Sequence, residues 1–165
     1  MKKIVVGVDG SAGSEAAFEW ALRQAEITGS DLTAVLAYSY ELWWIDGGTD
    51  YESKVIEHNA LKARHTLDEL LAKWTPDSAS VTVHPIVVEG HTTTALLEIA
   101  READLLVVGS RGRGELAGLL LGSVSQRCAE RASCPVVVVP GGSLGPRSQQ
   151  RVSVRSKHHP LWEES

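Results

Sequence analysis

Hydrophobic residues along the chain fall into short uninterrupted runs and longer stretches in which they recur every three or four positions. The short runs are rich in β-branched residues and too short for a buried helix, which predicts strands covered on both faces. They are Ile4–Val8, Leu32–Ala37, Val81–Val88, Leu105–Val108 and Val136–Val139. The third run alternates in part and contains Pro85, so we expect it at the edge of a sheet.

The longer stretches lie between the short runs and carry the spacing of helices with one buried face. They are Ser14–Gly29, Ile56–Trp74, Thr92–Ala103 and Val124–Ala132. Ser11 or Ser14 is placed to cap the first helix, Gly29 to end it, and Pro76 to end the second. Strands and helices therefore alternate, which predicts an α/β fold: a doubly wound, five-stranded parallel sheet with helices on both faces.

Two segments break this pattern. Residues 38–52 combine aromatic residues with paired glycines, which fits either a lid over a site or packing of Trp43 and Trp44 on the domain edge. Residues 141–165 are rich in Gly, Ser, Arg and Gln without periodicity, a composition typical of a flexible tail. We therefore expect one domain over residues 1–140, followed by that tail.

In a doubly wound sheet, ligands bind beyond the carboxyl ends of the strands. Two loops should meet there, the Asp9 turn after the first strand and the loop from Gly109 to Ser123 after the fourth. The second loop is rich in glycine and leads into a helix, whose N-terminal N–H groups attract anions. Arg111 and Arg113 add positive charge, although a solvated position is equally ordinary for loop arginines. The loop predicts a site for nucleotide phosphates.

Composition restricts the location and the partners. The chain has 165 residues, 43% of them hydrophobic and 22% charged, which is typical of one globular domain. Its net charge is −5, and residues 1–140 carry −7 because the tail contributes +2, which argues against a nucleic-acid partner. Asp9 interrupts the N-terminal apolar run, so we expect no signal peptide or membrane span and a cytoplasmic location. Cys128 and Cys134 match no zinc spacing, and reduced, buried thiols are expected.

Catalysis competes with simple binding as the function of the loop. Rapid hydrolysis needs a base or water-positioning group near the γ-phosphate and a carboxylate that holds a metal. Glu115 is the best candidate base, but its place in a loop beside Arg113 favours a surface role. The sequence therefore favours a binding module over an enzyme, with a slow ATP hydrolase or phosphotransferase as the alternative.

Two other nucleotide motifs fail on their context. A Walker-type loop is excluded because Glu115 stands where the phosphate-binding lysine is required. The run from Gly112 to Ala117 satisfies a dinucleotide fingerprint, but that fingerprint belongs after the first strand and here follows the fourth.

Three separated segments resemble the nucleotide-binding branch of the universal stress protein family. They are the opening Val6-Gly-Val-Asp-Gly-Ser11, the pattern Gly-x2-Gly-x9-Gly-Ser that starts at Gly109, and the closing Cys134-Pro-Val-Val-Val-Val139. The resemblance covers about residues 2–140. It implies the strand order 3-2-1-4-5 and a homodimer paired through the last strand, Val136–Val139.

The resemblance also implies a set of ATP-binding residues. Asp9 would accept hydrogen bonds from the ribose, with a cap on the first helix as its alternative role, and the backbone of Ala37 would meet the adenine edge. The sugar and phosphate contacts would be Val108, Gly109, Gly112, Gly122, Ser123, Val124 and Ser125. Arg111 and Arg113 complete the expected set, and Ser123 would cap its helix or bind phosphate.

The implied function is an ATP-binding regulatory module of the stress response, whose nucleotide occupancy biases a dimer or a partner complex. Mg²⁺ is compatible with a bound triphosphate, although the sequence offers no evident protein ligand for it. A pure interaction protein that has lost its ligand is a further alternative, against which the intact glycines and Asp9 speak.

Overall fold

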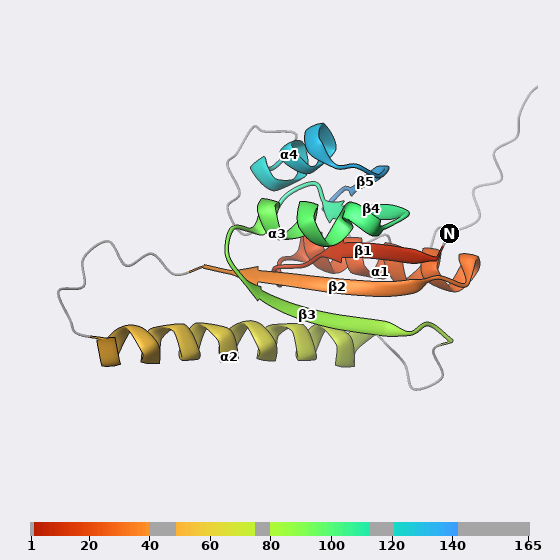
Figure 1. The fold of residues 1–165 in the computed structure, drawn as a ribbon. Helices are drawn as coiled ribbons and strands as arrows, with labels where there is room; N and C mark the ends of the chain where they lie inside the picture. The colour runs from red at the N-terminus through yellow and green to blue at the C-terminus, as the bar shows by residue number, and fades with distance from the viewer. Residues whose placement is uncertain (1, 40–48, 75–79, 113–120, 142–165) are drawn as a thin grey trace, which may run out of the picture.

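The computed structural model describes residues 2–39, 49–74, 80–112 and 121–141 and, in its second helix, side chains from residue 56 onward. Five parallel strands form one sheet in the order β3-β2-β1-β4-β5, with helices on both faces (Figure 1). The strands are β1 (Lys3–Gly7), β2 (Asp31–Tyr38), β3 (Val83–Glu89), β4 (Leu105–Gly109) and β5 (Val136–Val139). The helices are α1 (Ala12–Thr28), α2 (Thr49–Trp74), α3 (Thr92–Ile99), the 3₁₀ turn η1 (Ala100–Glu102) and α4 (Ser123–Arg131). The predicted fold class is confirmed, and so is the strand order implied by the resemblance.

Two apolar layers hold the helices on the sheet. On one face α1 and α2 pack on the strands around Phe18, Leu32 and Leu67, which are fully buried. On the other face α3 and α4 enclose Leu96 and Cys128. Because both faces are covered, the central strands need no polar alternation, which explains the uninterrupted apolar runs of the sequence.

Capping residues place the ends of α1. Ser11 is its N-cap, and the Ser11 hydroxyl accepts a hydrogen bond from the backbone N–H of Ser14 at 3.2 Å. The helix therefore begins at Ala12, earlier than the apolar spacing indicated. Gly29 ends it in the left-handed conformation with φ 63°, as predicted.

The second helix is longer than predicted. It begins at Thr49, and β2 extends to Tyr38, so the expectation of an irregular loop over residues 38–52 was wrong for its first residue and its last four. The prediction missed this turn because residues 49–55 contain few apolar positions at helical spacing. Trp43 and Trp44, and with them the choice between a lid and edge packing, lie outside the described residues, as do residues 142–165 of the predicted tail.

The third strand lies at the edge of the sheet, as its proline predicted. Pro85 stands opposite Ala34 of β2, and no other described strand pairs with β3 on its outer side. The following helix is shorter than predicted, because its last turn tightens into η1.

Asp104 joins the beginnings of β1 and β4, at the sheet edge opposite the carboxyl ends. Its Oδ2 accepts hydrogen bonds from the backbone N–H groups of Lys2 at 2.6 Å and Lys3 at 3.0 Å. In return, the Asp104 N–H donates to the Lys3 carbonyl at 2.9 Å. The bonds from Lys2 and then Lys3 favour the charged carboxylate and hold the pKa of Asp104 below its ordinary value.

Replacing Asp104 with asparagine should lower stability at neutral pH, because a neutral amide accepts the same hydrogen bonds less strongly. A lowered folded-state pKa contributes stability that is present above the unfolded pKa of ~4 and lost as the pH falls through the folded value. Unfolding midpoints of Asp104→Asn and the unchanged chain should therefore differ at pH 7 and converge as the pH falls below the lowered pKa of Asp104. A difference between the two unfolding midpoints that stays constant with pH would contradict this role of Asp104.

The two cysteines are free thiols, as expected. Cys128 lies on the inner face of α4 and is fully buried, and burial raises its pKa to about 11. Cys134 is only half-buried, so the expectation of a buried thiol was wrong for this residue. A neutral, buried thiol is a poor nucleophile, so Cys128 acts as a small core residue. Among the described residues, no helix is long and apolar enough to cross a membrane.

Candidate functional site

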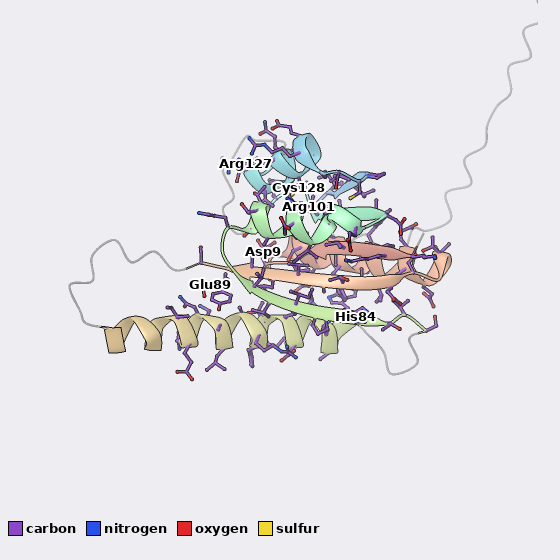
Figure 2. The ribbon with its side chains drawn as sticks, in the orientation of Figure 1. Asp9, His84, Glu89, Arg101, Arg127 and Cys128 are labelled. Carbon is purple, nitrogen blue, oxygen red and sulfur yellow. The ribbon has the colours of Figure 1, made fainter. Side chains whose placement is uncertain are left out.

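A cavity of about 460 Å³ opens at the carboxyl edge of the sheet, where β1, β2 and β4 end. Ten of the eleven predicted site residues line it, and the eleventh, Arg113, lies outside the described residues. Asp9 comes from the turn after β1, visible in Figure 2, and Ala37 from the end of β2. The others follow β4 or begin α4: Val108, Gly109, Arg111, Gly112, Gly122, Ser123, Val124 and Ser125. The fold thus brings together residues from four separate parts of the sequence.

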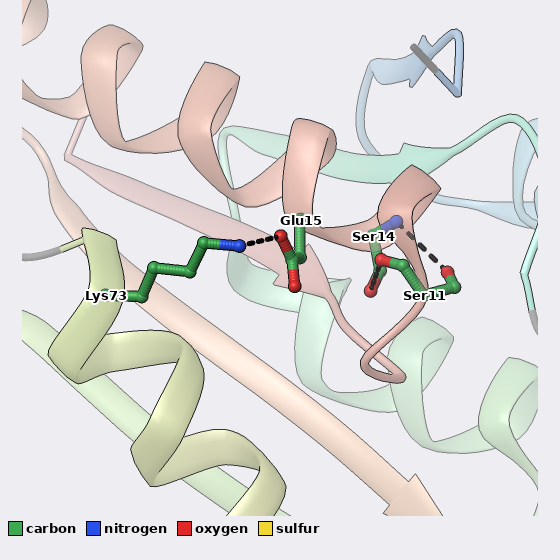
Figure 3. Close-up of polar contacts among 4 residues, drawn as sticks. All are labelled: Ser11, Ser14, Glu15 and Lys73. Atoms are coloured by element: carbon green, nitrogen blue, oxygen red, sulfur yellow. Dashed lines mark hydrogen bonds and ion pairs between the residues drawn. The ribbon is translucent and has the colours of Figure 1, made fainter. Parts of the chain in front are cut away.

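Hydrogen bonds within the turn after β1 hold Asp9 in place. Its Oδ1 accepts from the Ser11 N–H at 2.9 Å, and its own N–H donates to the Ser14 hydroxyl at 3.2 Å. The Ser14 hydroxyl in turn donates to the Ser11 carbonyl at 2.9 Å (Figure 3). Gly10 allows the sharp turn with its φ of 79°. The N-cap of α1 is therefore Ser11, while the Asp9 carboxylate orders the turn that precedes it and faces the cavity.

The two main loops of the site meet with almost no space between them. A Cβ on Gly112 would lie 2.5 Å from Asp9 Oδ2, so the glycine lets the second loop pass directly over the carboxylate. Two further glycines allow an equally close approach. A Cβ on Gly109 would lie 2.7 Å from the carbonyl oxygen of Gly13, and a Cβ on Gly13 would lie 2.5 Å from the carbonyl oxygen of Arg111. The first turn of α1 and the loop after β4 are thus in direct backbone contact.

Backbone hydrogen bonds join the two ends of the glycine loop, the segment from Gly109 to Ser123 that leads from β4 to α4. The Gly122 N–H donates to the Ser110 carbonyl at 2.7 Å, and the Ser110 N–H donates to the Val139 carbonyl at 2.6 Å. The Ser110 hydroxyl also accepts from the Gly141 N–H at 3.1 Å. Ser110 therefore links the ends of β4 and β5 to the residue before α4.

The first turn of α4 faces the cavity. Gly122 is its N-cap with extended backbone angles, so of the two roles considered for Ser123 the cap is wrong: Ser123 is the first helical residue. The N–H groups of this turn, from Ser123 to Ser125, have no acceptor within the helix. Ser125 is buried, and its hydroxyl donates to the Gly109 carbonyl at 2.5 Å. Its hydroxyl proton is therefore directed to the backbone, and its N–H is the group it offers to the cavity.

The charge of the lining differs in sign from that of the chain. Among the described lining residues, Lys62 and Arg111 are basic and Asp9 is acidic, a sum of +1 against −5 for the whole chain. With the partial positive charge of the α4 N-terminus, this favours an anionic ligand. Asp9 is the one carboxylate among these residues, and no described cluster of three His, Cys, Asp or Glu side chains could hold a metal ion. Glu115, the candidate base, lies outside the described residues.

Sequence reasoning missed the contribution of α2 to the cavity. Asn59, Lys62 and Thr66 of this helix line the cavity beside Ala63, and Thr92 adds a hydroxyl from the start of α3. The signal was present in the spacing, because positions 59, 63 and 66 continue the same helix face as the core residue Leu70. Polar residues on a face that is otherwise apolar could have identified them.

Comparison with known proteins gives one family. Residues 1–140 match the family model described as the universal stress protein family. A universal stress protein of Mycolicibacterium smegmatis is 40% identical over 137 residues, which cover 82% of this chain and 45% of that protein. A universal stress protein of Mycobacterium tuberculosis strain H37Rv is 37% identical over 138 residues, which cover 82% of this chain and 44% of that protein. The chain thus spans about half the length of the curated relatives it matches.

Solved structures agree with this result. The universal stress protein UspA from Lactobacillus plantarum has a TM-score of 0.74 at 23% identity, covering 84% of this chain and 97% of that one, which supports the fold. A universal stress protein in complex with cAMP has a TM-score of 0.64 at 31% identity, and the match covers 86% of this chain and 98% of that one. The family model spans nearly all the described residues, and the three sequence segments that resemble the family lie within it. The chain belongs to the universal stress protein family.

Proposed function

We propose that the chain is a nucleotide-binding regulatory module of the stress response and that ATP occupies the cavity. The observation that carries this proposal is the meeting of the Asp9 turn, the end of β2, the glycine loop and the start of α4 around one cavity. A nucleotide with its phosphates at α4 and the glycine loop would place its ribose near Asp9 and its base near Ala37. This order follows the order of the strands, β4, β1 and β2.

The chemistry of each part fits the corresponding part of a nucleotide. N–H groups at the first turn of α4, with Arg111 nearby, suit phosphate oxygens. A carboxylate at Asp9 suits two ribose hydroxyls, since it accepts several hydrogen bonds. The structure solved with cAMP, at 31% identity, supports an adenine nucleotide as the ligand class.

Binding rather than rapid hydrolysis is the function that these residues favour. A fast hydrolase holds a base or water-positioning group and a metal-binding carboxylate at the γ-phosphate. Asp9, the one described carboxylate of the lining, is engaged in its own turn and lies over the sugar end in the proposed orientation. Mg²⁺, when bound with ATP, would be held by the phosphates and by water, as this ion commonly is.

Nucleotide occupancy would act on a dimer or a partner through neighbouring elements. Ser110 joins the glycine loop to the end of β5, whose outer edge pairs with no described strand. A homodimer formed along Val136–Val139 would therefore lie directly behind the phosphate site. Changes in the loop on binding would reach that interface through one hydrogen-bonded residue.

The proposal predicts that the purified chain carries or takes up adenine nucleotide. Protein denatured after purification should release it in stoichiometric amount, or the empty protein should bind added ATP in calorimetry. Light scattering of the same samples, with and without ATP, reports whether occupancy changes the molecular mass. Protein that is empty and also ignores ATP would overturn the proposal.

The relative solved with cAMP makes cAMP a second candidate ligand. The two nucleotides differ at the phosphates, because ATP carries a linear triphosphate, whereas cAMP carries a single phosphate closed in a ring onto its ribose. Competition between them in the same calorimetric experiment ranks them directly.

A further inference from the structure

Helix α2 reaches past the sheet on the side of the cavity. Its 26 residues correspond to ~39 Å of helix, whereas the eight residues of β2 span only ~26 Å. Lys73 in its last turn contacts Glu15 in the first turn of α1, with Nζ and Oε2 2.6 Å apart (Figure 3). Since α1 begins at the carboxyl edge of the sheet, this contact places the last turn of α2 beside the first turn of α1, and Figure 1 shows α2 extending beyond β2 and β3.

The inner face of α2 changes in character along its length. Toward the C-terminus it carries Leu67 and Leu70, which are buried against the sheet. On the same side, Asn59 lies about two turns before Leu67 and Thr66 one turn before Leu70; both are half-buried and line the cavity, with the buried Ala63 between them and Lys62 next to them. Leu67 and Leu70 thus face the sheet, whereas Asn59 and Thr66 face the cavity.

We propose that Asn59, Lys62 and Thr66 form the wall of the cavity on the side of the base, and that Asn59 selects the base by hydrogen bonding to its edge. This inference rests on the proposed function, since it assigns one end of the same cavity. Helix α2 packs on β2 and β3, whereas the glycine loop and α4 belong to β4 and β5 on the other half of the sheet. A ligand with its phosphates at α4 therefore presents its other end to α2.

The three side chains differ in what they offer to a base. The Thr66 hydroxyl donates to the Lys62 carbonyl at 3.0 Å, which leaves it as an acceptor toward the cavity. Lys62 offers donors only, whereas the Asn59 amide combines a donor and an acceptor in one plane. That combination matches adenine, whose N7 accepts and whose N6 amino group donates, while guanine presents two acceptors, O6 and N7, on the same edge. Asn59 is therefore the group that can distinguish the two bases.

The test compares Asn59→Ala with Leu61→Ala, an equal kind of truncation two residues away. Leu61 is 64% exposed and is absent from the cavity lining, so this control retains the whole wall. Affinities are measured by calorimetry for ATP, GTP and inorganic tripolyphosphate, which has no base. We expect Asn59→Ala to weaken ATP binding about tenfold and GTP binding less, so that the ratio of the two falls. Tripolyphosphate binding should stay unchanged in both variants.

The outcomes separate this inference from the function on which it rests. Failure of the unchanged chain to bind ATP contradicts the proposed function itself. ATP binding with an ATP-to-GTP ratio that Asn59→Ala leaves unaltered overturns the assignment of Asn59 alone. A third variant, Lys62→Ala, tests the orientation: weaker tripolyphosphate binding would place Lys62 at the phosphates and refute the wall on the base side.

Discussion

Replacing Gly122 with glutamate is expected to weaken ATP binding at least about a hundredfold while leaving the domain folded. The new carboxylate would lie at the N-cap of α4, where the helix N-terminus attracts it into the position proposed for the phosphates. Two like charges ~4 Å apart at a protein surface repel by ~4 kcal/mol, and each ~1.4 kcal/mol is a factor of ten in affinity. Calorimetric titration with ATP measures the loss.

Gly122→Ala separates the effect of the charge from that of the side chain itself. A Cβ at this position would lie 3.5 Å from the Ser110 carbonyl oxygen, an ordinary contact, and the backbone φ of −72° suits any residue. The alanine variant should therefore retain most of the ATP affinity. Retained affinity in the glutamate variant would mean that the phosphates lie elsewhere. If cAMP is the ligand, its short cyclic phosphate predicts a much smaller loss with glutamate.

Gly13→Ala should destabilise the fold by about 2 kcal/mol, although alanine is the better helix former by up to ~1 kcal/mol. Gly13 lies in the first turn of α1, and its Cβ would be 2.5 Å from the carbonyl oxygen of Arg111. The neighbour is backbone, so it cannot rotate away, and the loop after β4 would have to move. Denaturant unfolding, followed by circular dichroism, measures the difference.

The control for Gly13 is again Gly122→Ala, which introduces a methyl group into the same region without a close contact. We expect its free energy of unfolding to stay within ~0.5 kcal/mol of the unchanged chain. Equal or greater stability of Gly13→Ala would show that helix propensity outweighs the backbone contact. Such a result would contradict the close packing of α1 on the glycine loop.

Local chemistry explains why much of the fold was predictable from the sequence. Uninterrupted β-branched runs identified the strands, Pro85 identified an edge, and Gly29 identified the end of α1. Each of these signals is a property of a single segment, because it depends on the backbone or on burial of that segment. The strand order, by contrast, entered only through the family resemblance.

The parts of the site that sequence reasoning missed depend on long-range packing. The reach of α2 over the cavity depends on how the helix packs on α1 and the sheet, including the contact between Lys73 and Glu15, which no local pattern encodes. The role of Gly13 was likewise not predicted, since an isolated glycine early in a helix gives no sign of which loop it contacts. Ser123 was misplaced by one position because Gly122 and Ser123 are both acceptable N-caps.

The bond between Gly122 and the Ser110 carbonyl has a consequence for how the protein could change during evolution. It joins the N-cap of α4 to the residue after β4 through the backbone alone, so the two ends of the glycine loop are held together by the chain itself. The entropy of closing such a segment grows only with the logarithm of its length, about 0.6 kcal/mol for each doubling. The bond depends on Ser110 and Gly122 and not on what connects them, so a change in the number of connecting residues should leave the start of α4 beside β4.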